Sequence, residues 1–237
     1  MMESARVLLV EDDAPLQRFV SLALSELPLE LHCCDSVDTA LALLEKNPGV
    51  QLILTDLMLP GRSGFELIEN LAQRPAPLPR IVVFSAGLST SAQARLAELP
   101  VWRLLAKPCT VLALEACVRE ALQFAEEAPS VAAATGHRHA DAAVQHFGGD
   151  QALYDGYRAG CLRQFAADAA AGDAACAARD AQALLRLAHN LKSVLLLLGH
   201  ESASAQASQL EHAASIGAWD AALPLWQDLR ESLQGLD

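Results

Sequence analysis

The chain has 237 residues, of which 52% are hydrophobic, and a formal net charge of -12. This hydrophobic share excludes a disordered chain, and the length is enough for two domains that each bury a core. The acidic balance argues against nucleic-acid binding, which needs clustered Lys and Arg. Neither half is basic, because residues 1–127 hold 10 basic and 17 acidic residues and the remainder holds 7 and 12.

The first half of the chain alternates strand and helix signals. Short apolar segments rich in leucine and β-branched residues predict five strands, over residues 6–10, 29–33, 51–55, 80–85 and 101–106. Helical spacing predicts a helix after each of them, over residues 14–27, 36–46, 63–73, 89–99 and 110–127. Near-continuous apolar strands separated by helices indicate a doubly wound, five-stranded parallel sheet covered on both faces, in a domain of residues 1–127.

The second half carries a different pattern. Residues 128–138 contain Pro129, small residues and no periodicity, so we interpret them as a linker. Residues 139–237 are rich in alanine and leucine at helical spacing and show no strand pattern. They predict an antiparallel bundle of four or five helices, in which Gly172 and Asp173 either break the first long helix or lie inside it. The predicted fold class is therefore α/β plus all-α.

Cysteine spacing and hydropathy predict where the protein resides. The six cysteines form no C-x-x-C pair, which favours reduced side chains in a cytosolic protein. No basic region followed by an apolar run marks the N-terminus, so we expect no signal peptide. The longest apolar run, residues 194–198, is too short to cross a bilayer. We therefore expect a cytoplasmic protein without membrane insertion.

Acidic residues follow two strands that are neighbours in the predicted sheet. Glu11, Asp12 and Asp13 come directly after the first strand, and Asp56 follows the third. With a strand order of 2-1-3-4-5, the carboxyl ends of these strands flank the point where ligands bind in such folds. Three carboxylates in one crevice repel each other unless a cation lies among them. Mg²⁺ fits, because it prefers a few carboxylates together with waters and phosphate oxygens.

Two further polar residues lie at strand ends. Ser85 ends the fourth strand, and Lys107 follows the fifth. A lysine there can neutralise a phosphoryl oxygen, and a hydroxyl can donate a hydrogen bond to another. A single Asp after a strand is usually a turn or helix cap. Polar residues at five such positions instead favour phosphoryl transfer, which depends on positioning and charge neutralisation.

Residues 5–125 resemble a response-regulator receiver domain. The matching segments are VLLVEDD, DLMLPGRSGFELI, FSA and AKP, in the family's order and spacing. The resemblance implies a flavodoxin-like fold, with Asp56 as the phosphoacceptor and Ser85 and Lys107 in contact with the phosphoryl group. It also implies a magnesium site formed by Asp12, Asp56, the carbonyl oxygen of Met58 and, through water, Glu11.

One position departs from the receiver pattern. Receivers often carry an aromatic residue three before the lysine, which reorients on phosphorylation. Here that position is Leu104, and Trp102 lies two residues earlier. We therefore expect phosphorylation to signal weakly through this face, which a receiver that passes phosphate onward would need less.

The segment LLRLAHNLKSVLLLLG in the second half carries His189. At 100° per residue, a buried stripe forms on one side of the helix, made of Leu184, Ala188, Leu191, Leu195 and Leu198. His189, Ser193 and Leu196 fall on the opposite side, so we expect His189 to face solvent. Lys192, a helix neighbour, would offset the charge of a phosphoryl group on the ring. The small Ser193 would leave room for a partner.

This stretch resembles the histidine-phosphotransfer (HPt) domain, a four-helix bundle, over about residues 140–235. The family pattern of His, Leu, Lys, a small residue and Gly at +0, +2, +3, +4 and +10 is matched here by His189, Leu191, Lys192, Ser193 and Gly199. Further matches are Phe165, Asp168, Leu210 and Glu211. Val194 and Leu195 stand where the family has small residues, so slower or narrower docking is expected. The other six histidines lack zinc-ligand spacing.

Together these patterns predict a two-component phosphorelay protein. Asp56 would accept a phosphoryl group with Mg²⁺ as the cofactor, and His189 would accept or pass one to a receiver aspartate. The predicted partners are a sensor histidine kinase and other receiver domains, with no nucleic acid. No Gly-rich ATP-binding loop is present, so the chain is not expected to form phosphohistidine from ATP. Whether it is an enzyme stays open.

Three alternatives stay open at this point. Phosphorylation of Asp56 could gate the bundle toward outside partners without any internal transfer. The bundle could be a non-catalytic adaptor that only binds a partner. Phosphatase activity toward a partner is the third alternative.

Overall fold

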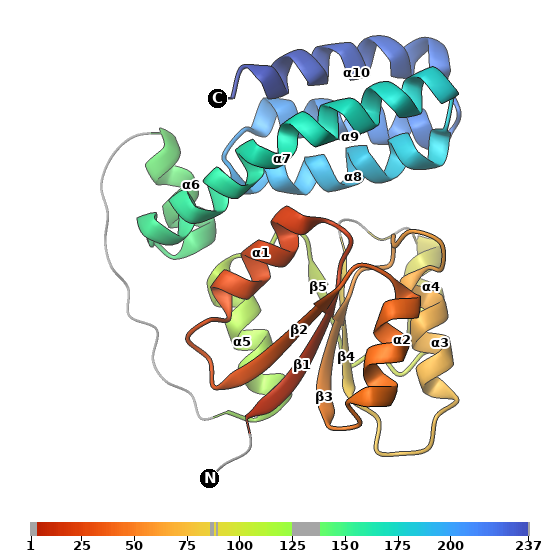
Figure 1. Cartoon of the computed structure of the whole chain (residues 1–237), viewed down its shortest axis with the longest axis vertical. Helices are drawn as coiled ribbons and strands as arrows, with labels where there is room; N and C mark the ends of the chain where they lie inside the picture. Colours follow the sequence, from red (N-terminus) through yellow and green to blue (C-terminus); the bar gives the residue numbers. More distant parts are fainter. Residues whose placement is uncertain (1–3, 86–87, 89, 125–137, 237) are drawn as a thin grey trace. The chain divides into compact units, whose positions relative to one another are not determined.

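The computed structural model describes residues 4–85, 88, 90–124 and 138–236. The chain divides into two compact units, residues 1–130 and 131–237. The predicted linker, 128–138, lies outside the described residues except for Arg138. Figure 1 labels the helices and strands of both units.

The first unit is built on a five-stranded sheet. Its strands are β1 (Ala5–Val10), β2 (Leu29–Cys34), β3 (Val50–Thr55), β4 (Arg80–Ser85) and β5 (Arg103–Ala106). Their order is β2-β1-β3-β4-β5, and every neighbouring pair is parallel, as predicted. The central strands are almost wholly buried because helices cover both faces, which explains their continuous apolar sequence.

Five helices cover this sheet. The helices α1 (Ala14–Ala23) and α5 (Val111–Leu122) lie on one face. The helices α2 (Val37–Lys46), α3 (Gly64–Ala72) and α4 (Thr90–Ala97) lie on the other (Figure 1). The side chains of Asp13, Ser36 and Thr110 accept backbone N–H groups at the starts of α1, α2 and α5.

Helix α1 ends earlier than the predicted residue 27. Its last residue is Ala23. The backbone N–H of Leu24 then bonds to the Val20 carbonyl, and that of Ser25 bonds to the Leu22 carbonyl. The Ser25 hydroxyl also donates to the Leu22 carbonyl, at 2.8 Å. These bonds satisfy the last carbonyls of the helix, so the chain turns before β2.

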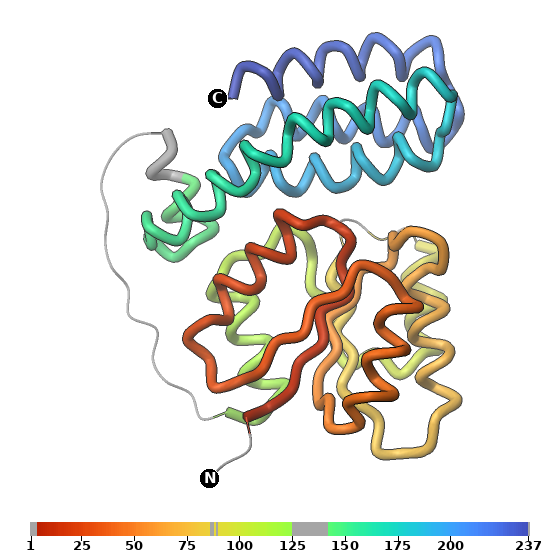
Figure 2. Tube along the Cα trace, viewed as in Figure 1, coloured from red at the N-terminus to blue at the C-terminus, as the bar shows by residue number. Residues whose placement is uncertain are grey.

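The second unit contains no strand among its described residues. Its helices are α6 (Arg138–Phe147), α7 (Gln151–Ala178), α8 (Ala181–Leu197), α9 (Glu201–Ser215) and α10 (Trp219–Gln234). Helix α8 packs on α7 and α9, and α10 packs on α7 and α9 (Figure 2). Their buried face includes Tyr154, Tyr157, Leu184 and Leu229.

Helix α7 runs through Gly172 and Asp173 without a break, which decides between the two predicted alternatives. A Cβ atom on Gly172 would lie 2.1 Å from Cζ2 of the Trp226 ring in α10. The glycine is therefore explained by the close approach of an indole ring rather than by a helix end. The Trp226 Nε1–H also donates to Asp173, at 2.9 Å.

Two other expectations concern the whole chain. All six cysteines are free thiols. Among the described residues, none of the helices combines the length and the apolar character that a membrane crossing requires.

Candidate functional site

The ends of three strands place three charged side chains in one pocket of the first unit. The backbone N–H of Glu11 bonds to Cys34, that of Asp56 to Val10, and that of Lys107 to Ser85. Each bond continues the parallel ladder by one residue beyond the strand. The side chains of Glu11, Asp56 and Lys107 therefore leave the sheet at the same edge, as the sequence predicted.

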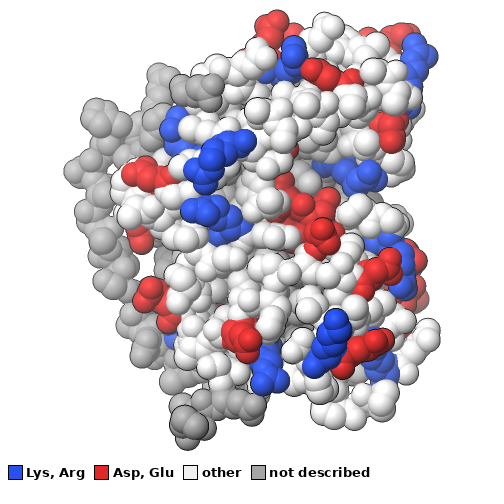
Figure 3. Space-filling model, viewed as in Figure 1, with Lys and Arg blue, Asp and Glu red and all other residues white. Residues whose placement is uncertain are grey.

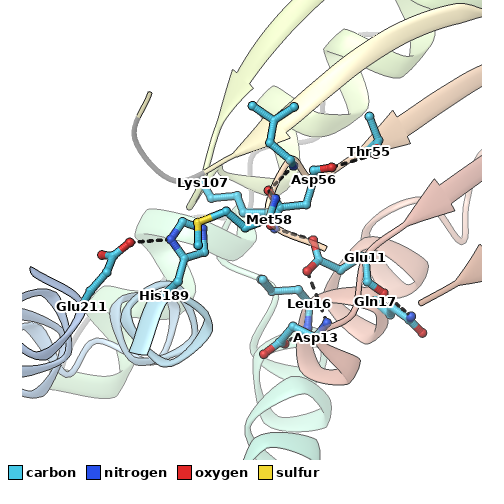
Figure 4. A network of polar contacts seen from close by, with 11 residues as sticks. Glu11, Asp13, Leu16, Gln17, Thr55, Asp56, Met58, Lys107, His189 and Glu211 are labelled. Carbon is cyan, nitrogen blue, oxygen red and sulfur yellow. Dashed lines mark hydrogen bonds and ion pairs between the residues drawn. The ribbon is translucent and has the colours of Figure 1, made fainter. Parts of the chain in front are cut away.

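Lys107 joins the two carboxylates of this pocket (Figure 4). Its Nζ donates to Glu11 Oε2 and, at 2.7 Å, to Asp56 Oδ2. The other oxygen of Asp56 accepts the N–H groups of Leu57 and Met58, at 2.5 and 3.2 Å. The charged side chains of the ion pairs are fully buried. Asp56 is thus held in one orientation by three donors.

Burial and charge oppose each other in this pocket. Burial raises the pKa of Glu11 to about 8, although Lys107 acts to lower it. Burial acts to lower the pKa of Lys107, but the charges of Glu11 and Asp56 outweigh this effect and raise it above its usual value. With both carboxyl groups ionised, one lysine leaves the pocket one positive charge short.

The oxygen donors of the pocket fit the chemistry of Mg²⁺. Two of the predicted ligands, Glu11 and Asp56, already share the cation of Lys107, and a small hard cation takes such oxygen ligands together with waters and phosphate oxygens. Asp12 is half-buried in the connection that follows β1. No group of three His, Cys, Asp or Glu side chains is arranged as a metal site among the described residues.

The connection that carries Asp56 closes only because Gly64 has no side chain. The Gly64 N–H, at the start of α3, donates to the Leu57 carbonyl at 3.0 Å. A Cβ atom here would lie 2.0 Å from the carbonyl oxygen of Asp56. Gly64 belongs to the family segment DLMLPGRSGFELI, and its close approach to Asp56 was not predicted. Its position just after the Ser63 cap was the signal that the helix begins close to Asp56.

Ser85 and Leu104 lie on β4 and β5, at their predicted positions. Ser85 is the last residue of β4 and is 6% exposed. Leu104 is 46% exposed. The guanidinium carbon of Arg103 lies 4.4 Å from the centroid of the Trp102 ring. This neighbouring aromatic therefore makes a cation–π contact.

The second unit contains a separate polar cluster on α8 and α9. His189 Nδ1 lies 2.6 Å from Glu211 Oε1, and Lys192 Nζ donates to Glu211 Oε2 at 2.5 Å (Figure 4 draws His189 and Glu211). Burial acts to raise the pKa of Glu211, but the hydrogen bonds from His189 and Lys192 outweigh it and lower the pKa. An ionised carboxylate only accepts, so Nδ1 donates to Glu211, and the neutral form of the ring then has its lone pair on Nε2.

The prediction that His189 faces solvent is wrong. Its side chain is 2% exposed, Ser193 is 1% exposed and Leu196 is half-buried. The predicted stripe of Leu184, Ala188, Leu191, Leu195 and Leu198 is buried, as expected. Helical spacing describes α8 alone, and it takes no account of what packs against the other side of the helix.

The cluster also contains a contact that was not predicted. Glu211 was matched only to a family position, and in the structure it accepts a hydrogen bond from Lys192. The expected action of Lys192 on a phosphoryl group stays a prediction. His189 Nε2 has no hydrogen-bond partner among the described residues.

Comparison with known proteins relates the first unit to a known family. Residues 7–119 match the family model described as response regulator receiver domain. The chain is 31% identical over 133 residues to the response regulator protein PilR of Pseudomonas aeruginosa, covering 54% of this chain and 29% of that protein. It is 27% identical over 157 residues to the DNA-binding transcriptional regulator NtrC of Azospirillum brasilense, covering 66% of this chain and 32% of that protein.

The similarities cover only part of each relative. The chain spans about a third of the length of these two curated proteins. Among solved structures, the signal receiver domain of an HD domain-containing protein from Pseudomonas fluorescens is 24% identical with a TM-score of 0.49, covering 52% of this chain and 90% of that one.

The charged surface bears on the expected absence of nucleic acid. On the face shown in Figure 3, Lys and Arg side chains lie among Asp, Glu and uncharged residues in each unit. One relative is named as DNA-binding. The expectation that this chain binds no nucleic acid therefore stays a prediction that follows from its net charge of -12.

Proposed function

We propose that the chain is a phosphorelay protein in which Asp56 and His189 each carry a phosphoryl group. The observation that supports this most is His189 Nδ1 held on Glu211, which leaves Nε2 as a nucleophile. The second unit is then a histidine-phosphotransfer domain with antiparallel helices. The short connections between α7, α8, α9 and α10 support that arrangement. The partners are a sensor histidine kinase and other receiver domains.

At Asp56, the phosphoryl group comes from a phosphohistidine. The P–N bond of the donor breaks, a P–O bond to the Asp56 carboxylate forms, and the donor nitrogen regains its lone pair. Lys107, already bonded to Asp56, is within reach of the incoming phosphoryl oxygens, and the Ser85 hydroxyl donates to another. Mg²⁺, held when bound by Glu11, Asp12, Asp56 and the Met58 carbonyl, supplies neutralising charge.

At His189, the phosphoryl group comes from the aspartyl phosphate of a receiver. The lone pair of Nε2 forms the P–N bond, and the P–O bond breaks to return the carboxylate. The ring gains positive charge, which lies 2.6 Å from an oxygen of Glu211. Glu211 therefore acts as the positioning residue that fixes the tautomer and stabilises the charged ring.

The low exposure of His189 favours a second function alongside the first. An aspartyl phosphate must reach Nε2, and a side chain that is 2% exposed does not offer it. We propose that phosphorylation of Asp56 controls access to His189. Under this gating function, the state of the receiver sets how fast an outside partner reacts with His189.

Binding of a phosphoryl analogue tests the receiver half of the proposal. We expect beryllofluoride to bind the full chain only with Mg²⁺, and Asp12→Ala to abolish binding. The control Asp38→Asn changes an exposed carboxylate on α2 and should leave binding unchanged. Binding without metal, or unchanged binding in Asp12→Ala, would count against the site.

Loss of the histidine tests the bundle half. His189→Ala should lose acid-labile phosphate received from a partner receiver and keep binding to that partner. If His189→Ala retains signalling, the bundle is an adaptor. With beryllofluoride bound, His189 should react faster with a phosphorylated partner receiver, and an unchanged rate would exclude the gating function.

A further inference from the structure

A shallow apolar groove runs between α9 and α10, away from the residues that the proposed function uses. Its volume is about 630 Å³, and its lining is mostly apolar. The lining residues are Ala205, Ala213, Ala218, Ala221, Ile216 and Leu225, together with the polar Ser208, Gln209 and His212. The small side chains leave the space between the helices unfilled. Ile216 is 65% exposed, more than any other large hydrophobic side chain among the described residues.

The rim of this groove is acidic. Glu201 lies four residues before Ala205 on α9, and Asp228 lies three residues after Leu225 on α10, so both share the face of the groove. Asp220 adjoins Ala221. All three are exposed and their carboxylates have no ion pair within the described part of the chain.

No cation of α9 or α10 neutralises this rim. The single Lys or Arg in residues 199–236 is Arg230, and its guanidinium binds Asp173 of α7 at 3.1 Å. Among the described residues that line the groove, His212 is the one titratable side chain. An occupant therefore needs apolar side chains to fill the groove and positive charges to meet the rim.

We propose that the α9–α10 groove docks an amphipathic helix of a partner protein, with an apolar stripe flanked by Lys and Arg. Two packed helices present a groove that accepts the side-chain ridge of a third. Helix α9 has 15 residues, which corresponds to roughly 22 Å or four turns of the docked helix. A second copy of this chain fits poorly, because a two-fold contact at this face would oppose two acidic rims.

The test uses the full chain and a fluorescein-labelled helical peptide of leucines and lysines, about four turns long. We expect saturable binding that is lost when glutamates replace the lysines. Ile216→Asp should weaken binding about ten-fold or more, because an apolar contact in the groove is lost. The matched control Leu112→Asp alters an exposed leucine of α5 and should change affinity less than two-fold.

The added charge separates docking from general attraction to an acidic protein. Nonspecific electrostatic binding would tighten in both variants, since each gains a negative charge, and that result would overturn the proposal. Equal affinity of the wild type and Ile216→Asp would also overturn it. If sedimentation shows a dimer of the wild type that is lost in Ile216→Asp, the occupant of the groove is a second copy of this chain, and the proposal of a basic helix is overturned. Circular dichroism of each variant checks that the bundle remains folded.

Discussion

The two proposed acceptor sites differ in how charge is arranged around the acceptor. In the receiver, Asp56 is a buried anion held by a buried cation, Lys107, and by two backbone N–H groups. In the helical unit, a carboxylate holds the ring of His189 at Nδ1. Under the proposed relay, the first site has to attract a dianionic group to an anion, and the second has to keep a nitrogen lone pair available.

This difference explains where each site is built. The receiver pocket needs charges from separate strands, and the parallel sheet brings the carboxyl ends of β1, β3 and β5 to the same side of the domain. The proposed histidine site needs only one orienting acceptor, which a neighbouring helix provides at Glu211. The first site therefore depends on the topology of the sheet, and the second depends on a side-chain contact between two helices.

The largest effect is expected when the cation of Lys107 is removed from the receiver pocket. Lys107→Met leaves Asp56 buried without its counter-charge, so we expect a loss of about 3–5 kcal/mol in unfolding free energy at pH 7. The loss should grow as the pH rises above about 8, because Lys107 stabilises the ionised form of Glu11 in the wild type. Urea denaturation measures both. The control Lys46→Met changes an exposed lysine of α2. Equal losses of unfolding free energy in the two variants would contradict the role of Lys107 as the buried counter-charge.

The second prediction tests the close approach at Gly64. Gly64→Ala forces a Cβ against the Asp56 carbonyl, so we expect a loss of about 1–3 kcal/mol in unfolding free energy. Beryllofluoride affinity should fall as well, because the connection that carries Asp56 must shift. The control Gly156→Ala meets no atom within 4 Å on α7. That substitution should leave beryllofluoride affinity unchanged and raise the unfolding free energy by up to about 1 kcal/mol. Unchanged binding in Gly64→Ala would show that the glycine has no positioning role.

The third prediction tests the orienting carboxylate. Glu211→Gln should slow transfer to His189 about ten-fold or more, because an amide does not select the tautomer as an anion does. The lowered pKa of Glu211 stabilises the fold above its ordinary value of 4.5, and this contribution is lost as pH falls through the lowered pKa.

The pH profile separates positioning from general destabilisation. Between pH 6 and pH 3 the wild type should lose more unfolding free energy than Glu211→Gln, by about 1 kcal/mol. Glu201→Gln, an exposed carboxylate of α9, serves as the control and should follow the wild type in both measurements. Parallel profiles for the wild type and Glu211→Gln would contradict the assigned role.

The smallest expected effect on stability concerns docking to α8. Leu196→Glu should weaken the docking of a partner receiver while changing stability by less than about 1 kcal/mol, because Leu196 is only half-buried. Transfer rates and urea denaturation give the two readouts. Normal transfer rates would show that this face of α8 is not the docking face.

Local sequence signals predicted the sheet and its pocket because each depends on short segments. Apolar runs located the strands, and the order 2-1-3-4-5 brought Glu11, Asp56 and Lys107 together. The approach of Gly64 to Asp56 was not predicted, because it depends on atomic distances across a connection. The burial of His189 was missed for a related reason, since periodicity reports one helix and exposure depends on everything packed around it.

The central claim is tested most directly by tracing labelled phosphate on the full chain. A phosphorylated kinase donor is mixed with the wild type, Asp56→Asn and His189→Gln, and acid-labile phosphohistidine is separated from base-labile aspartyl phosphate. The relay predicts both species in the wild type, no phosphohistidine in Asp56→Asn, and aspartyl phosphate alone in His189→Gln. Absence of phosphohistidine from the wild type, with aspartyl phosphate present, would contradict it.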